Sequence, residues 1–129
     1  MTVTAEASDC VVAYDGAAGC VVMTWRGYGS SGRFRASNER VLEAIARHGA
    51  SRLLGDIEAL GEIAPEDQAW LTEDWIPRAV SHGLRRAALV TPAFEVGHAA
   101  VLLVGERLSA PELRFFDEIE AGRAWLASA

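Results

Sequence analysis

Hydrophobic residues near the start of the chain are gathered in two short runs. Cys10–Tyr14 and Cys20–Trp25 are apolar and rich in β-branched residues, and the stretch between them begins with Asp15-Gly16. Asp-Gly between two such runs is typical of a β-hairpin, because the turn needs a positive φ at its centre. We therefore predict that the fold begins with a hairpin.

From Arg33 to His48 the apolar residues change to a helical spacing, and Gly49 follows as a stop signal. Further elements are then expected in this order: a strand at 52–57, a helix from Pro65 to Gly83 that Pro77 interrupts or restarts, a strand at 86–91, a helix at 94–108, a strand at 112–116 and a helix at 117–126. Strands that alternate with helices indicate a mostly parallel sheet. We predict one α/β domain over residues 1–129, in which the hairpin leads into a mixed sheet of about five strands with about four helices.

The charged residues narrow the range of functions. The net charge is −6, and all 12 basic residues are arginine. Without lysine there is no P-loop lysine for nucleotide phosphates and no Schiff-base lysine for pyridoxal phosphate. An acidic chain without a run of arginines argues against nucleic acid or an anionic membrane surface as a partner. No apolar stretch approaches the roughly 20 residues that span a bilayer, so we expect no membrane span.

The number of cysteines helps to predict the cellular compartment of the protein. The only two are Cys10 and Cys20, and the residues after Met1 do not form a signal-peptide pattern. We expect free thiols in a cytoplasmic protein. The alternative is a disulfide across the predicted hairpin.

Four segments together resemble a known family. They are Trp25-Arg26-Gly27, LLGDIEAL at 53–60, EDQAWLTEDWIPRAVSHGLRRAALVTP at 66–92 and LRFFDEIEAGRAWL at 113–126. The set resembles the small bacterial SpoIIAA-like proteins, a branch of the STAS superfamily that is related to CRAL-TRIO lipid-transfer domains, and the likeness runs from about Asp9 to Leu126. It implies a STAS fold, a homodimer, and a binding or regulatory role through a protein partner or a small ligand.

In the anti-sigma-factor antagonists of that superfamily, a serine that opens the helix after the third strand is phosphorylated. The matching stretch here, Ile63 to Asp67, has no hydroxyl residue. The resemblance therefore implies the fold without the phosphoserine switch. Glu66 and Asp67 place negative charge at the same helix start, where the helix dipole favours it, and are expected to imitate the phosphorylated state.

A glycine-rich loop offers a different function. Gly27-Tyr28-Gly29-Ser30-Ser31-Gly32 is a literal G-x-G-x-x-G between a predicted strand and a predicted helix, and Asp56 ends the next strand. This arrangement is the one required for dinucleotide binding. The other interpretation is a loop that only leads into a helix, and the bulky Trp25 and Arg26 before it favour that interpretation.

Other residues are candidates for a ligand site. Asp56 and Glu58 follow a strand at the edge of the sheet where α/β proteins bind ligands, although Asp56 accepting hydrogen bonds from loop amides is the simpler role. Tryptophans 25, 70, 75 and 125 would supply the walls of an apolar pocket. The candidate ligand-binding residues are Trp25, Arg26, Asp56, Glu58, Thr91, Trp70 and Trp75.

Catalytic and metal sites are not expected. No nucleophile motif is present. One Glu95-x-x-His98 pair is too little for a metal centre. We expect a non-enzymatic cytoplasmic binding or regulatory module without a cofactor. The alternatives are a carrier or sensor of an apolar, lipid-like ligand and nucleotide binding through the Gly27–Gly32 loop.

Overall fold

A six-stranded sheet forms the centre of the molecule. The computed structural model describes residues 1–91 and 111–128. The strands are β1 (Thr2–Glu6), β2 (Cys10–Asp15), β3 (Cys20–Trp25), β4 (Arg52–Asp56), β5 (Arg86–Val90) and β6 (Glu112–Phe116), and they lie side by side in sequence order. The first three pair antiparallel, and β3 to β6 pair parallel. The predicted α/β fold with a mixed, mostly parallel sheet is confirmed.

The strand count differs from the prediction at the N-terminus. Thr2–Glu6 forms an additional edge strand that pairs only with β2, and a register shift between Val3 and Ala5 interrupts that pairing. Its residues alternate between polar and apolar but are exposed or half-buried, so the segment lacks the continuous apolar run that marks β2 and β3. The sheet therefore has six strands where about five were expected.

The hairpin joins β2 and β3 as predicted, but its turn differs in detail. Asp15 Oδ1 accepts a hydrogen bond from the Ala18 amide at 3.2 Å, which holds the start of the turn. The positive φ lies at Gly19, at 65°, and not at Gly16. The loop is longer than a two-residue turn, so the left-handed residue stands next to the second strand.

Helix α1 (Ser31–His48) begins two residues before the predicted start. The Ser30 side chain caps it by accepting from the Arg33 amide at 3.2 Å. Gly49 ends it with a left-handed φ of 59°, where its amide meets the last carbonyls of the helix. The helical spacing predicts one face of Phe34, Val41, Leu42, Ile45 and Ala46. The first four are buried and Ala46 is exposed.

The next helical segment continues through the predicted break at Pro77. It consists of α2 (Pro65–Trp70), a π-helical turn η1 (Leu71–Trp75) and α3 (Ile76–Ser81). The Ile76 amide donates to the Leu71 carbonyl, five residues back, immediately before the proline. Proline has no N–H to continue an α-helical ladder, and the wider π-turn before it keeps the segment helical. Pro77 thus restarts the helix without ending it.

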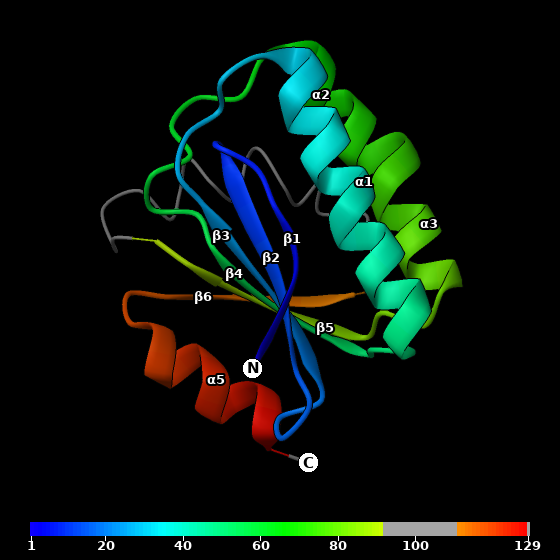
Figure 1. Ribbon diagram of the computed structural model, residues 1–129, viewed down its shortest axis with the longest axis vertical. Coiled ribbons are helices and arrows are strands. Elements are labelled where there is room, and N and C mark those ends of the chain that lie inside the picture. Colours follow the sequence, from blue (N-terminus) through cyan, green and yellow to red (C-terminus); the bar gives the residue numbers. More distant parts are fainter. Residues whose placement is uncertain (92–110, 129) are drawn as a thin grey trace.

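The helices divide between the two faces of the sheet. Helices α1, α2 and α3 cover one face, and α5 (Ile119–Ala127) covers the other (Figure 1). Alternate strand residues point to opposite faces, so Leu53 and Ala87 join the core under α1–α3, whereas Leu54 and Ala88 join the core under α5. The helix predicted at 94–108 lies outside the described residues.

Both cysteines are free and buried. The hairpin register pairs Cys10 with Trp25 and Cys20 with Asp15, which puts the two thiols at opposite ends of the hairpin and in different cores. The alternative of a cross-strand disulfide is therefore wrong. Burial, with a smaller contribution from Asp9, raises the pKa of the Cys10 thiol to about 12.

We expect the Cys10 thiol to be inert in the folded protein. Because its pKa lies far above neutral pH, the reactive thiolate is scarce at pH 8, and burial also blocks access. The aromatic disulfide DTNB should label both cysteines at once in denaturant, and in native buffer only as fast as the protein unfolds. Stoichiometric labelling of Cys10 within seconds under native conditions would contradict the described burial.

Candidate functional site

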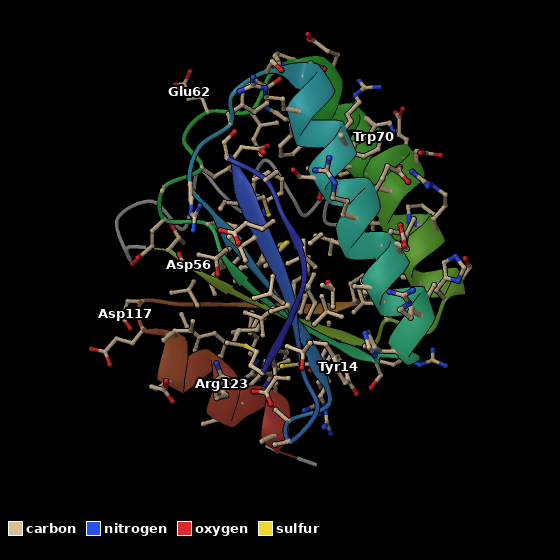
Figure 2. All side chains as sticks on the ribbon, viewed as in Figure 1. Tyr14, Asp56, Glu62, Trp70, Asp117 and Arg123 are labelled. Carbon is tan, nitrogen blue, oxygen red and sulfur yellow. The ribbon has the colours of Figure 1, made fainter. Side chains whose placement is uncertain are left out.

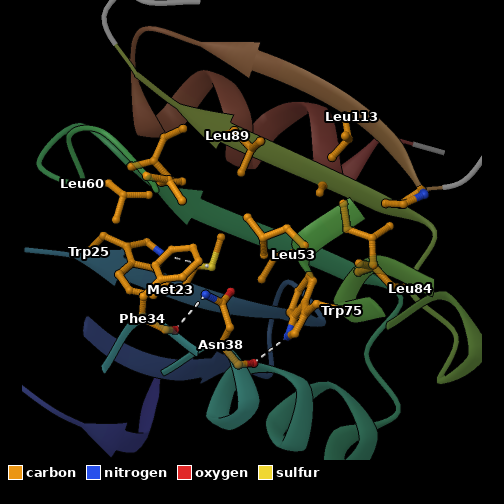
Figure 3. A pocket seen from close by; sticks show the side chains of 16 residues that line it. Met23, Trp25, Phe34, Asn38, Leu53, Leu60, Trp75, Leu84, Leu89 and Leu113 are labelled. Atoms are coloured by element: carbon orange, nitrogen blue, oxygen red, sulfur yellow. Dashed lines mark hydrogen bonds between the residues drawn. The ribbon is translucent and has the colours of Figure 1, made fainter. Parts of the chain in front are cut away.

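An apolar pocket lies between the sheet and helices α1–α3 (Figure 3). Its cavity volume is about 50 Å³. Side chains from the strands form one wall, and side chains from the helices and from the segment after β4 form the other. The lining residues are Met23, Trp25, Phe34, Asn38, Leu53, Ile57, Leu60, Ile63, Leu71, Trp75, Ile76, Leu84, Ala87, Leu89, Pro111 and Leu113.

The sheet side of the pocket depends on a glycine. Met23, Gly55 and Leu89 stand side by side on β3, β4 and β5. A Cβ at Gly55 would lie 2.6 Å from Met23 Cε and 3.0 Å from Leu89 Cδ2. The missing side chain lets the other two close over the central strand, so they form a continuous apolar floor.

Among the described residues that line the pocket, Asn38 is the one with an amide side chain, and the others are apolar or aromatic. It lies on α1, only 3% exposed, in the apolar stripe that contains Phe34 and Leu42. Its Nδ2 donates to the Phe34 carbonyl at 2.9 Å. Figure 3 shows this side chain rising from α1 between Trp25 and Trp75.

The indole N–H groups in the pocket already have acceptors. Trp75 Nε1 donates to the Asn38 backbone carbonyl at 2.7 Å, which fixes α1 against η1. Trp25 Nε1 lies 3.3 Å from Met23 Sδ, and its ring packs on Phe34 with centroids 5.2 Å apart. Both tryptophans therefore present carbon surfaces to the cavity.

A buried carboxylate holds the starts of α1 and α2 together. Asp67 has a fully buried side chain although it lies in the first turn of α2. Its Oδ1 accepts from Arg35 Nε at 2.6 Å and from Ser31 Oγ at 2.8 Å, and its Oδ2 accepts from the Tyr28 hydroxyl. Residues from the loop, from the first turns of α1 and from α2 thus meet at one anion.

These contacts set the protonation state of the cluster. Burial alone would raise the pKa of Asp67, but the hydrogen bonds from Tyr28, Arg35 and Ser31 outweigh it and hold the pKa below its ordinary value. Burial, together with the neighbouring Asp67, raises the pKa of the Tyr28 hydroxyl. At neutral pH the cluster is therefore an ionised carboxylate held by a protonated phenol and an arginine.

The position of Asp67 changes two sequence-based interpretations. It is not a surface charge, so of the two acids expected to imitate a phosphate only Glu66 is exposed. Its carboxylate also contacts the Ser31 side chain in the first turn of α1, close to the place after the glycine-rich loop where a dinucleotide phosphate would bind. A phosphate in that place would meet a like charge. Nucleotide binding through Gly27–Gly32 stays a prediction.

The predicted ligand residues do not form one site. Trp25 and Trp75 line the pocket. Arg26 does not line it, and its guanidinium pairs with Glu6 at 3.6 Å. Asp56 lies at the end of β4 (Figure 2), where its Oδ1 accepts from the Glu58 amide at 3.1 Å, and Glu58 itself is exposed. Asp56 therefore has the simpler role, a hydrogen bond to a loop amide.

The remaining candidates lie elsewhere. Trp70 does not line the pocket. It lies in the helical layer (Figure 2), and the guanidinium groups of Arg35 and Arg78 are 5.1 and 6.0 Å from its ring centroid. Trp125 is a residue of α5 on the opposite face of the sheet, where its ring centroid lies 5.8 Å from that of Phe116. Thr91 is buried, and its amide donates to the Phe116 carbonyl at 2.9 Å. The expectation that all four tryptophans line one pocket is wrong: Trp125 lies on the opposite face of the sheet, and Trp70 packs against the same core as Trp25 and Trp75 without lining the cavity.

The sequence analysis missed Asn38 and Asp67. An asparagine in the apolar stripe of Phe34, Leu42 and Ile45 could have been noticed in the sequence, because burying an amide costs free energy unless it is hydrogen-bonded. Asp67 gave no such signal. Its three partners are more than 30 residues away, and a carboxylate in the first turn of a helix has an ordinary explanation there.

Residues 1–91 and 111–128 contain neither a membrane-spanning helix nor a cluster of metal ligands. Within them, no helix is long and apolar enough to cross a membrane. The same residues hold no group of three or more potential metal ligands. Glu95 and His98 lie outside the described residues.

Comparison with known proteins gives one result. A family model described as SpoIIAA-like matches residues 20–127. Searches of the curated proteins and of the solved structures give no match. The matched range contains β3 to β6, all the described helices and both walls of the pocket. The chain therefore belongs to the SpoIIAA-like family of the STAS superfamily.

Proposed function

We propose that this chain is a non-enzymatic cytoplasmic binding module that holds a small apolar, lipid-like ligand between its sheet and helices α1–α3. The observation that carries the proposal is the pocket itself. The described residues of its lining are apolar apart from one asparagine, and the indole N–H groups of Trp25 and Trp75 already have acceptors within the protein. Small-molecule sites combine such apolar walls with a few placed polar groups.

The ionisable groups near the pocket support binding without catalysis. Asp67 is ionised, fully buried and held by three donors, so it is poorly placed to exchange a proton with a substrate. Cys10 keeps its proton because its pKa is about 12. Screens with hydrolase and oxidoreductase substrates should therefore stay at background. Turnover that a single side-chain change abolishes would overturn this part of the proposal.

The size of the cavity limits the ligand. Its volume of about 50 Å³ is smaller than the roughly 150 Å³ that accommodates benzene in an engineered cavity. A compact ring, or the end of a longer hydrocarbon chain, would enter the cavity if the flexible Met23 side chain changed its rotamer. We infer that the module takes small or slender ligands.

Thermal unfolding tests the proposed function. A ligand that binds only the folded protein, at ten times its Kd, stabilises it by about 1.4 kcal/mol. Differential scanning calorimetry with increasing furan and benzene should therefore show a Tm that rises with concentration and saturates. A Tm that stays constant or falls up to the solubility limits of both compounds would contradict a binding pocket.

We also propose that the module works without the phosphoserine switch of its relatives. The segment Gly61–Trp70 has no hydroxyl side chain, and the nearest, Thr72, donates to the Gln68 and Ala69 carbonyls. Incubation with anti-sigma-factor kinases and ATP should leave this segment unmodified in mass-spectrometric peptide maps. Stoichiometric phosphate on Gly61–Trp70 would contradict the proposal. The homodimer implied by the family stays a prediction, which sedimentation equilibrium would decide.

A further inference from the structure

The pocket contains one hydrogen-bond acceptor that has no donor among the described residues. Asn38 Nδ2 donates to the Phe34 carbonyl, and the Asn38 backbone carbonyl receives Trp75 Nε1. No described residue donates to Asn38 Oδ1. Among the described residues that line the pocket, Oδ1 is therefore the polar side-chain atom without a hydrogen-bond partner.

The orientation of the Asn38 amide is set by its neighbour. Rotating the amide by 180° would turn Oδ1 toward the Phe34 carbonyl oxygen and replace a hydrogen bond by the repulsion of two acceptors. Nδ2 is therefore held on Phe34 and Oδ1 is held toward the cavity, as Figure 3 shows. The acceptor is fixed before any ligand arrives, so a donor that meets it loses little free energy to reorganisation.

Water is a poor partner for this oxygen. A buried water molecule makes about three hydrogen bonds, and a site with one good polar partner does not hold it well. The other groups around the cavity are hydrocarbon, indole carbon and a thioether, which is a weak acceptor. An apolar ligand with one N–H or O–H group matches both the walls and the acceptor.

We propose that the pocket selects apolar ligands that carry one hydrogen-bond donor, and that Asn38 Oδ1 accepts the hydrogen bond from this donor. This inference rests on the proposed function. The ligand class is that of small alcohols, phenols and N–H heterocycles, in contrast to hydrocarbons, ethers and other ligands that only accept. Asn38 is the specificity-determining residue, and the apolar walls supply general affinity.

Pyrrole and furan form a matched pair for the test. Both are five-membered aromatic rings, but pyrrole carries an N–H donor where furan carries an oxygen. Ligand-observed NMR titration gives the Kd of each. A hydrogen bond made on binding predicts that the wild type prefers pyrrole by about three- to tenfold. Asn38→Leu keeps a similar shape without the acceptor, so it should bind furan at least as well as pyrrole.

Each outcome decides between the two proposals. If neither ring binds the wild type, the pocket is not a binding site and both proposals fail. If both rings bind equally well, or if Asn38→Leu keeps the preference for pyrrole, the donor selection is wrong and the apolar site stands. Should Asn38→Leu not fold, the N–H proton of pyrrole bound to the wild type serves instead. A downfield shift relative to free pyrrole supports the hydrogen bond to Asn38, and an upfield or unchanged resonance overturns it.

Discussion

Replacing Asp67 by alanine is expected to lower the free energy of unfolding by about 3 kcal/mol, which is a large effect for one side chain. The change leaves the Tyr28 and Ser31 hydroxyls without their acceptor and removes the partner of Arg35. Because the Arg35 side chain is 39% exposed and remains partly hydrated, the loss lies at the lower end of the range for broken buried ion pairs.

Urea unfolding measures this loss, and the neighbouring residue provides its control. Glu66 is exposed, and only its backbone carbonyl contacts Arg35, so Glu66→Ala should change the stability by less than about 0.5 kcal/mol. Equal midpoints for Asp67→Ala and Glu66→Ala would show that the buried cluster contributes nothing.

The effect of Asp67 should depend on pH in a defined direction. Its pKa is lower in the folded protein than in the unfolded chain, so its contribution is fully present above the unfolded value, which is about 4. The contribution is lost as the pH falls through the folded pKa. The stability gap between the wild type and Asp67→Asn should therefore be constant from pH 5 to pH 8, and it should narrow below about pH 4.

Filling the pocket is expected to weaken ligand binding strongly. Ala87 lies on β5 in the floor of the cavity, and leucine at this position adds three carbon atoms to a space of about 50 Å³. We expect the Kd for furan to rise at least about tenfold, while added packing largely offsets any strain and keeps the protein folded.

The matched control for Ala87→Leu is Ala124→Leu. Ala124 is an exposed residue on α5, on the other face of the sheet, so the same three atoms are added without reaching the pocket. Ligand-observed titration should give the wild-type Kd for Ala124→Leu. Unchanged furan binding by a folded Ala87→Leu variant would place the ligand elsewhere.

The elements with strong local signals were predictable. The apolar spacing of 33–48 with Gly49 behind it predicts α1, and the run of Arg86 to Thr91 predicts β5, because burial on one or both faces imposes such patterns. The edge strand β1 has neither face fully covered, and its short alternation of polar and apolar residues was not recognised as a strand. The π-turn η1 precedes Pro77 and is defined by the hydrogen bond from the Ile76 amide to the Leu71 carbonyl. The spacing of apolar residues in the sequence does not specify that bond.

The site was less predictable than the fold, because its geometry comes from long-range pairing. Trp25 and Trp75 were chosen as pocket residues for their size, and they do line the pocket. Trp70 and Trp125 are equally large but do not line it. Trp125 lies on the other face of the sheet, whereas Trp70 is partly buried against the same core but outside the cavity, so size alone does not identify a pocket residue. Asn38 could have been found from its place in the apolar stripe of α1.

The two methionines permit the most direct measurement of ligand binding in the pocket. Met23 lines the cavity, whereas Met1 is 76% exposed and serves as an internal reference. In protein labelled with ¹³C at the methionine methyl groups, titration with furan should move the Met23 resonance along a saturable curve and leave that of Met1 in place. A Met23 resonance that stays unchanged while furan reaches its solubility limit would contradict the account.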